Sequence, residues 1–274
     1  MPRRSDNSAP AGVDDATAYF LDELAGARCA VPFQFLGLHP GAEGKGLVLR
    51  VWMPDADRVE VIDLREGRNL GPMERRGETD LFVLRLARRR RIFPYELRVC
   101  RKGREFAVQD PYQYRKAVFA RGPEDRNRLY RYLGAHPEVL EGEAGGETSG
   151  VRFAVYAPAA RSVSVVGPFN DWDGRRHPMQ SSYEGVWRLF VPGLEPGALY
   201  KFELKGPDGQ QLPAKADPFG FYSEQPPGNA SIVMDPMAYN WQDEGWVAAR
   251  REGGYRADRP MSIYEVHAGS WRRA

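Results

Sequence analysis

This sequence of 274 residues contains little cysteine or histidine, with two of the first and four of the second. Cys29 and Cys100 belong to no CxxC pair or other metal-ligand pattern. The histidines lie too far apart along the chain to match the spacing of a known metal site. We therefore expect neither a bound metal nor another cofactor.

Charge of one sign is also missing, because 39 basic and 37 acidic residues leave a net charge of +2. Such a balance creates no field that would favour nucleic acid or an anionic membrane as a partner. The run 88–91, four arginines, is better explained as a solvated connection between strands than as a phosphate-binding patch. No apolar run approaches the roughly 18 residues of a membrane span, and residues 1–8 lack the apolar segment of a secretory signal. A reduced, cytoplasmic protein is the expectation.

Turn-forming and aromatic residues, in contrast, are plentiful, with 29 glycines, 22 prolines and 12% aromatics. This composition favours short strands joined by turns over long helices. One short helix is predicted over 14–28, where Phe20, Leu21 and Leu24 share one face. Short aliphatic runs predict strands at 47–52, 59–64, 81–86, 92–99, 104–108, 151–156, 163–165, 187–191, 199–204 and 229–234.

An internal repeat organises these strands. Leu36-Gly37-Leu38-His39 recurs as Leu133-Gly134-Ala135-His136, 97 residues later. His39 and His136 therefore share a structural role where each copy begins. Further matches follow at offsets that rise slowly: Val59 with Val163 at 104, Phe82 with Trp187 at 105, Tyr95-Glu96-Leu97 with Phe202-Glu203-Leu204 at 107, and Asp110-Pro111 with Asp217-Pro218 at 107.

A duplicated module with small loop insertions explains this pattern. The predicted fold class is all-β, with two tandem immunoglobulin-like β-sandwiches after the short helix. The tail and helix occupy 1–30, the first sandwich 31–120, and a charged, then glycine-rich linker 121–150. The second sandwich occupies 151–240, and a further segment 241–274.

The two copies differ at residues 167–174, Gly-Pro-Phe-Asn-Asp-Trp-Asp-Gly, which we name the tryptophan turn. Its polar residues favour a turn, and Trp172 has no apolar period around it that would mark it as core. A ring presented by a polar loop can cover the apolar face of a sugar. The alternative is that Trp172 folds back to fill the edge of the sandwich. The first copy has Asp-Leu-Arg-Glu-Gly-Arg-Asn over 63–69 instead.

The run 169–179, together with 199–203 and 215–218, resembles the carbohydrate-binding module family 48 domain of glycogen branching enzymes. Residues 261–271 are similar to the segment that opens the catalytic (β/α)8 barrel of these glycoside hydrolase family 13 enzymes. Two tandem modules, each introduced by Leu-Gly-x-His, fit the long bacterial form of that family. The resemblance covers about residues 30–274.

The resemblance implies that Trp172 stacks on glucose and that Lys201 donates hydrogen bonds to its hydroxyls. Asn170 and Asn229 are the further candidates for contact with an α-glucan, whether glycogen, amylose or a maltooligosaccharide. Lys201 has a second explanation, as an exposed strand residue whose stem covers Tyr200 or Phe202.

The resemblance also implies that the catalytic carboxylates lie on later barrel strands. The chain ends at Ala274, after the segment similar to the first strand, so we assign no catalytic residue. The start of a truncated barrel is expected over 261–266, and 255–274 should be disordered or loosely packed without the rest of the barrel.

The leading hypothesis is a non-catalytic, glucan-binding and scaffolding portion of a branching enzyme, with the missing barrel as its second partner. One alternative is a purely structural module that binds no glucan. Another is the front part of a related debranching or trehalose-releasing enzyme.

Overall fold

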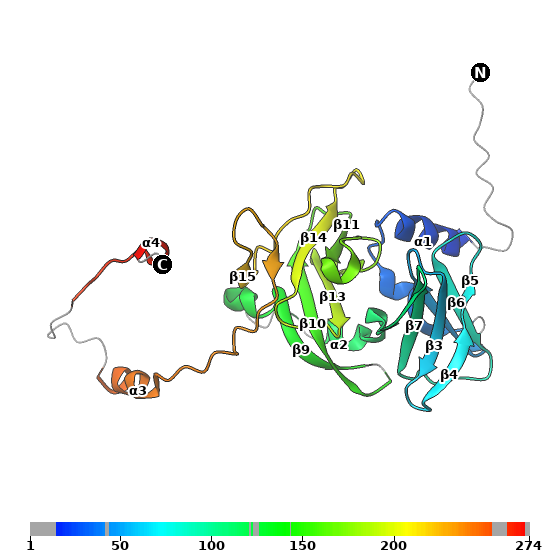
Figure 1. Cartoon of the computed structure of the whole chain (residues 1–274), viewed down its shortest axis with the longest axis horizontal. Coiled ribbons are helices and arrows are strands. Elements are labelled where there is room, and N and C mark those ends of the chain that lie inside the picture. The colour runs from blue at the N-terminus through cyan, green and yellow to red at the C-terminus, as the bar shows by residue number, and fades with distance from the viewer. Residues whose placement is uncertain are drawn as a thin grey trace, which may run out of the picture. The chain divides into compact units, whose positions relative to one another are not determined.

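A computed structural model describes residues 15–41, 44–120, 122, 126–142, 144–253 and 262–271. The chain divides into two units, residues 1–235 and 236–274. The first unit contains two β-sandwiches, each built from two four-stranded antiparallel sheets (Figure 1). The predicted all-β class with a short N-terminal helix is confirmed.

The first sandwich packs two sheets around an interior of alternating aliphatic residues. In the first sheet the order is β1 (Gly37–Pro40), β2 (Leu47–Trp52), β6 (Leu81–Leu86) and β5 (Glu74–Arg75). In the second it is β4 (Arg68–Pro72), β3 (Arg58–Asp63), β7 (Tyr95–Arg101) and β8 (Arg104–Val108). Leu49 of β2, Val61 of β3 and Leu97 of β7 lie in this interior, each with 0% exposure. Val59 and Val61 of β3 are both 0% exposed and lie two residues apart, because alternate side chains of a strand face the same side.

The second sandwich repeats this plan. One sheet has the order β12 (Gln180–Ser181), β13 (Val186–Pro192), β10 (Glu147–Tyr156) and β9 (Gly134–Glu141). The other has β11 (Ser162–Val166), β14 (Leu199–Lys205), β16 (Ser231–Ile232) and β15 (Tyr222–Ser223). Phe153, Leu189 and Phe202 form its interior, all at most 1% exposed.

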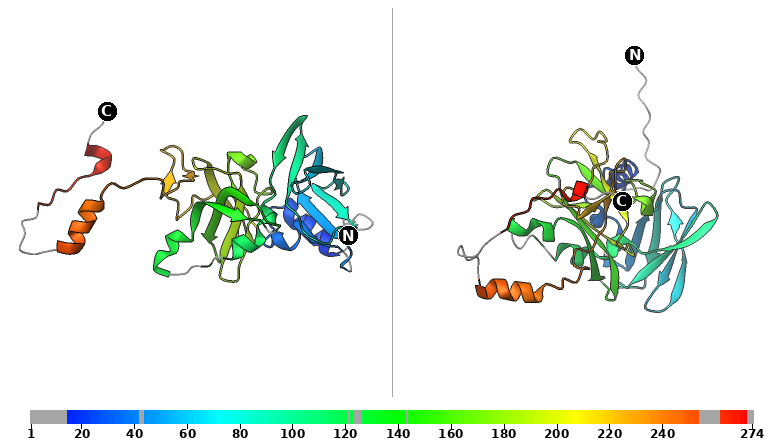
Figure 2. Two further views of the ribbon diagram at one scale, coloured as in Figure 1. Left: turned by 90° about the horizontal axis from the view of Figure 1, so that it is seen from below. Right: turned by 60° about the vertical axis from the view of Figure 1, so that its left-hand side comes forward.

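Helix α1 (Asp15–Ala25) lies at the junction of the two sandwiches, as Figures 1 and 2 show in blue. Its Leu24 is 1% exposed and belongs to one apolar cluster with Val48 of β2 and Phe153 of β10. The Oγ of Ser162 in β11 donates to the carbonyl of Ala27, which follows the helix. The outer face of the β2 sheet is therefore buried, which explains why Leu47–Trp52 is apolar almost throughout.

Short helices complete the connections. They are η1 (Pro32–Gln34), η3 (Pro111–Gln113), α2 (Arg115–Phe119) and η4 (Arg126–Arg131). Tyr112 of η3 donates its hydroxyl to the carbonyl of Pro178 in the second sandwich, 3.1 Å away. These segments tie the sandwiches together and are too short to show a helical period in the sequence.

The structure differs from the predicted linker over 121–150. Residues Gly134–Glu141 are β9, which pairs with β10 along its full length. The glycine-rich stretch after β9 is the tight turn of this hairpin, in which the amide of Gly142 donates to the carbonyl of Gly146. Gly145 and Gly146 have φ of +84° and +90°, the left-handed region that glycine enters without strain. The glycines close a hairpin and do not join two domains.

Strand pairing confirms the duplication and corrects its register. Val61 faces Leu97 in the first copy, and Val165 faces Phe202 in the second. Tyr95 therefore corresponds to Tyr200, at an offset of 105, and not to Phe202 as the sequence match at 107 suggested. Chemistry agrees, because Tyr95 donates its hydroxyl to buried Asp110 and Tyr200 donates to buried Asp217.

The Leu-Gly-x-His motif makes the same hydrogen bond in both copies. The Nε2 atoms of His39 and His136 lie 2.8 and 2.9 Å from the carbonyls of Leu36 and Leu133. Gly134 has φ of +105°, and a methyl group on it would lie 3.0 Å from the carbonyl oxygen of Phe219. The predicted shared structural role of the two histidines is confirmed.

The second unit contains α3 (Glu244–Gly253) and α4 (Ala268–Trp271). The barrel strand predicted over 261–266 is not formed at 262–267, where Ile263 is 84% exposed. A strand gains its hydrogen bonds from a neighbour, and none pairs with these residues in the part of the chain that the structure describes. Residues 255–261 and 272–274, part of the segment 255–274 predicted to be disordered or loosely packed, lie outside the described residues.

Gly134→Ala should destabilise the chain by about 1–3 kcal/mol, because the new methyl meets backbone in a left-handed conformation. Gly145→Ala is the matched control, since its φ is also positive but a methyl there would meet nothing within 4 Å. It should cost about 1 kcal/mol. Urea unfolding measures both. Equal losses would contradict the close approach to Phe219.

Candidate functional site

The tryptophan turn leaves the end of β11 and is held by one buried side chain, that of Asn170. Its Oδ1 accepts from the amide of Gly167, and its Nδ2 donates to the carbonyl of Val165, both at 2.9 Å. Nδ2 also lies 2.9 Å from Nδ1 of His177. Asn170 ends the helix η5 (Pro168–Asn170) and is 3% exposed.

Asn170 was predicted to contact an α-glucan, which requires an exposed side chain, but the structure buries it. Its amide is turned into the protein and its hydrogen bonds are used within the turn. A buried amide that is already paired would have to break these bonds to reach a ligand, at a cost of about 1–3 kcal/mol for each group left unpaired. Asn170 shapes the turn.

The two residues after Asn170 adopt a backbone conformation that side chains rarely occupy. Asp171 and Trp172 have φ of +59° and +58°. The amide of Trp172 donates to the carbonyl of Gly167 at 2.9 Å, which holds the chain in this conformation. Residues in such strained regions persist only where the surroundings determine them, and they gather at functional sites.

The side chain of Trp172 is presented to solvent. It is 42% exposed, whereas Trp187 in the sandwich interior is 3% exposed. The alternative in which Trp172 fills the edge of the sandwich does not describe this structure.

Lys201 and Asn229 lie beside the turn, on the next two segments of the same sheet. Lys201 of β14 pairs with Val166, the residue that precedes the turn. Asn229 is exposed and lies just before β16, which pairs with β14. The Nζ of Lys201 donates to the Oδ1 of Asn229. The Lys201–Asn229 pair thus lies on the segments next to β11, the strand from which the tryptophan turn leaves.

Close packing brings the turn against β14. A methyl group on Gly167 would lie 2.3 Å from the carbonyl oxygen of Leu199, so only glycine fits there. At the other end of the turn, a methyl group on Gly174 would lie 2.3 Å from a carboxylate oxygen of Glu203. The turn therefore runs alongside β14 from Leu199 to Glu203, and Lys201 lies between these two contacts.

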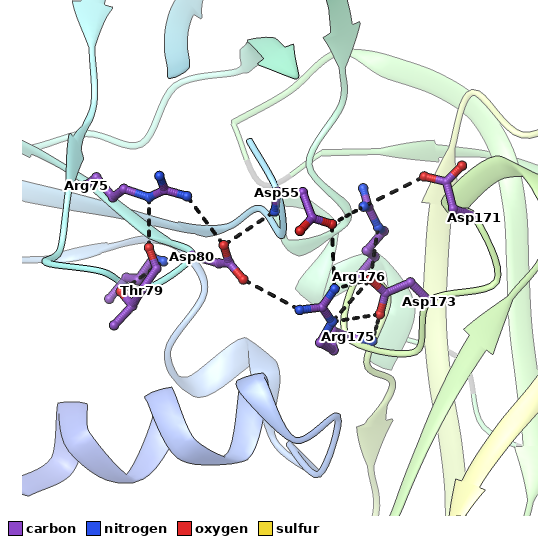
Figure 3. Close-up of polar contacts among 9 residues, drawn as sticks. Asp55, Arg75, Thr79, Asp80, Asp171, Asp173, Arg175 and Arg176 are labelled. Carbon is purple, nitrogen blue, oxygen red and sulfur yellow. Dashed lines mark hydrogen bonds and ion pairs between the residues drawn. The ribbon is translucent and has the colours of Figure 1, made fainter. Parts of the chain in front are cut away.

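A charged cluster connects the turn to the first sandwich (Figure 3). Arg176 lies 3.1 Å from Asp55 and 3.3 Å from Asp173. Arg175 bridges Asp173 at 2.8 Å and reaches Asp55 and Asp80 at 3.6 and 3.8 Å. Because Asp55 and Asp80 belong to the first sandwich, the base of the tryptophan turn is anchored in both modules.

The arginines of this cluster keep the carboxyl group of Asp173 ionised. Burial alone would raise the pKa of Asp173, but hydrogen bonds from the side chain and the amide of Arg175 hold it below its ordinary value. Asp173 is therefore ionised at neutral pH and keeps both arginines in place.

His177 forms a hydrogen bond with the buried amide of Asn170. Since Oδ1 of Asn170 accepts from Gly167, its Nδ2 is the donor, and Nδ1 of His177 must accept. This requires the neutral imidazole with its proton on Nε2. Burial lowers the pKa of His177 to about 4, and nearby Arg176 adds to the shift.

The first sandwich has different residues at the equivalent positions. Tyr95 corresponds to Tyr200, so Glu96 replaces Lys201. Where the second copy has the tryptophan turn, the first has Asp63, whose carboxylate is 0% exposed and accepts from the amides of Arg65 and Glu66. Arg89 pairs with the same carboxylate.

The structure also brings in residues that the sequence did not single out, namely Asp55, Asp80, Arg175, Arg176 and His177. The adjacent arginines and histidine in the run 169–179 were visible, but their partners in the first sandwich lie about a hundred residues away. Among the described residues, no cluster of His, Cys, Asp or Glu could hold a metal ion, and no helix is long and apolar enough to cross a membrane.

Comparison with known families matches both modules. Residues 17–112 match the model of the alpha-1,4-glucan branching enzyme GlgB N-terminal domain, and residues 132–220 match carbohydrate-binding module 48, the isoamylase N-terminal domain. Each of the two sandwiches therefore matches its own family model over these residues. The second match begins just before β9, where the second sandwich begins.

Relatives named 1,4-alpha-glucan branching enzyme GlgB extend the similarity to nearly the whole chain. That of Vibrio cholerae is 46% identical over 257 residues, which are 93% of this chain and 34% of the relative. That of Rubrobacter xylanophilus is 46% identical over 248 residues, 88% of this chain and 32% of the relative. The chain spans about a third of the length of the curated relatives it matches. Among solved structures, GBS pullulanase SAP in complex with maltotetraose matches 72% of this chain and 26% of its own at 13% identity, with a TM-score of 0.31.

The ionisation of His177 predicts a pH dependence of stability. Because its pKa in the folded chain, about 4, lies below the ordinary 6.5, its contribution is complete above pH 6.5. It is lost as the pH falls toward 4, by up to about 1.4 kcal/mol per pH unit. His177→Asn keeps an acceptor but cannot titrate, so its stability should fall less steeply between pH 6.5 and 4. Urea unfolding at several pH values tests this, and parallel curves for the two proteins would refute it.

Proposed function

We propose that this chain binds α-glucan through Trp172, Lys201 and Asn229. The chain would form the non-catalytic, glucan-binding and scaffolding portion of a 1,4-alpha-glucan branching enzyme. The observation that carries the proposal is the exposed Trp172 on a strained turn that leaves β11 beside Lys201, which is paired with Asn229. Glycogen, amylose and maltooligosaccharides are the proposed ligands.

The chemistry of the three side chains suits a sugar. The face of an indole ring covers the apolar C–H face of a pyranose, while polar groups at its edge take the hydroxyls. The ammonium of Lys201 has three donors, of which one is used by Asn229. The exposed carboxamide of Asn229 adds donors and an acceptor next to it. A rigid turn also lowers the entropy lost on binding.

Branching is the activity that the first module supports. Residues 17–112 match the N-terminal domain of a branching enzyme, whereas the second module alone matches a family described by an isoamylase domain. In a branching reaction an α-1,4 chain is cut and transferred to a 6-hydroxyl. We assign none of the catalytic carboxylates to this chain, and we propose a (β/α)8 barrel as the partner that carries them. Cys29 and Cys100 form no disulfide, which suits the cytoplasmic location we propose.

A purely structural role is the second candidate, and the charged cluster favours it. Arg175 and Arg176 fasten the turn to Asp55 and Asp80 whether or not a glucan binds. Removing the exposed ring of Trp172 separates glucan binding from the structural role, because this ring is not part of the charged cluster.

Trp172→Ala should abolish the retardation of the chain in native gels containing glycogen, because the apolar platform is lost. Binding should be weak and depend on avidity from the polymer, so the gel mobility shift is the suitable measurement. Lys201→Gln should weaken the shift several-fold. Trp246→Ala, at a tryptophan that is 62% exposed on α3, is the matched control and should migrate like the unchanged chain. Equal mobility of the Trp172→Ala and unchanged chains would leave only the structural role.

Branching and debranching are distinguished by counting reducing ends after the enzyme that carries these modules acts on a branched α-glucan such as amylopectin. Branching leaves their number unchanged, since each cut end is joined to a new 6-hydroxyl. A debranching or trehalose-releasing enzyme changes the reducing ends or releases a non-reducing product. A rise in reducing ends in proportion to the reaction would contradict the branching proposal.

A further inference from the structure

A groove of about 680 Å³ lies next to the tryptophan turn and is lined by both sandwiches. The first contributes Asp55, Arg101, Arg104 and Phe106, and the second contributes Asp171 and Asp173. These two aspartates stand on either side of Trp172 in the chain. The groove therefore borders the tryptophan turn.

Phe106 is the one aromatic side chain among the groove residues, and its position is unusual for a core residue. It lies on β8, the edge strand of its sheet, where four of the five residues are exposed. Phe106 itself is 38% exposed, and the guanidinium of Arg101 lies 5.4 Å from its ring centroid. A cation next to a ring stabilises it and limits its movement. An aromatic side chain fixed on an exposed edge suits contact with a ligand better than packing.

The hairpin that carries Phe106 is rigid. Its strands β7 and β8 are joined by Lys102 and Gly103, with φ of +51° and +72°, the tight two-residue turn that matches strand twist. The amide of Lys102 donates to the carboxylate of Asp57 at 2.7 Å. Phe106 pairs with Val99 in β7, which is 1% exposed. The ring is therefore presented at a fixed position on the first sandwich.

The groove and the turn are joined by a direct contact. Arg101, next to the ring of Phe106, lies 3.1 Å from the carboxylate of Asp171. Asp171 immediately precedes Trp172 in the chain, and both residues have a left-handed backbone. The two aromatic side chains are thus connected through one ion pair, on two different modules.

The charges of the groove favour a neutral, polar ligand. Four basic and three acidic side chains line it, and Asp55, Asp171 and Asp173 already pair with its arginines. A polyanion would meet these carboxylates. Sugar hydroxyls, in contrast, can accept from guanidinium groups and donate to carboxylates at the same time.

We propose that an α-glucan chain bound at Trp172 continues into this groove and meets Phe106 as a second aromatic platform. This inference rests on the proposed function. It makes the first sandwich part of the binding site, although that module lacks its own tryptophan turn. Its consequence is a preference for long chains over short ones.

Calorimetric titration of the 274-residue chain with maltotriose and with maltoheptaose tests this inference. Phe106→Ala should weaken binding of maltoheptaose about fivefold, the effect of losing one aromatic contact, and leave maltotriose unchanged. Phe106→Trp keeps a ring and should retain the affinity for maltoheptaose. Tyr183→Ala, at a fully exposed tyrosine outside the groove, is the control and should change neither affinity.

The outcomes separate this inference from the proposed function. If Trp172→Ala abolishes binding of both ligands and Phe106→Ala changes neither, glucan binds at the turn alone and the groove is not used. If Phe106→Ala weakens both ligands equally, the substitution acts through the fold and the inference is wrong. If the unchanged chain binds neither oligosaccharide but is retarded by glycogen in native gels, this inference is wrong and the proposed function stands. If glycogen does not retard it either, both fail together. Thermal unfolding of each variant checks that its fold is intact.

Discussion

The paired amide of Asn170 is the interaction on which the candidate site depends. It holds the amide of Gly167 and the carbonyl of Val165 at the end of β11, so the chain must turn at this point. The left-handed backbone of Asp171 and Trp172 follows from that turn, and the ring is thereby directed toward solvent. His177 and the arginine–aspartate cluster surround the turn and keep the strained conformation populated. Without this support, a tryptophan in a polar loop would have many alternative conformations.

Duplication explains why the two sandwiches share one framework but differ in the turn that follows β3 and β11. Both copies keep the same lead-in histidine, the same tyrosine–aspartate pair and the same strand register. They differ where β3 and β11 end. There the first copy closes its turn around buried Asp63, and the second opens a turn that presents Trp172. The framework residues specify the sandwich, so the turns could diverge at little cost to the core.

The two copies nevertheless act as one body at the site. Helix α1 precedes the first sandwich in the chain but packs against both, and one apolar cluster runs from Leu24 to the interior of the second sandwich. Burial of this kind favours a fixed arrangement of the modules. Asp55 and Asp80 can then support Arg175 and Arg176 with short ion pairs, because little entropy remains to be lost when these side chains meet.

Local pattern in the sequence was sufficient for much of this structure. Alternating strands, the repeat and the turn at Trp172 were all predictable, because a pleat, a turn and a duplicated motif leave their marks within a few residues. The glycines after β9 were mistaken for a linker, because a hairpin turn and a linker have the same composition. The sequence also could not distinguish Asn170 from Asn229, since both are asparagines near turns. Only the tertiary structure decided that the first is buried and the second exposed, and that Asp55 and Asp80 pair with the arginines that follow the tryptophan turn. Those contacts join residues about a hundred positions apart, and no local pattern records which distant side chains meet when two sandwiches pack together.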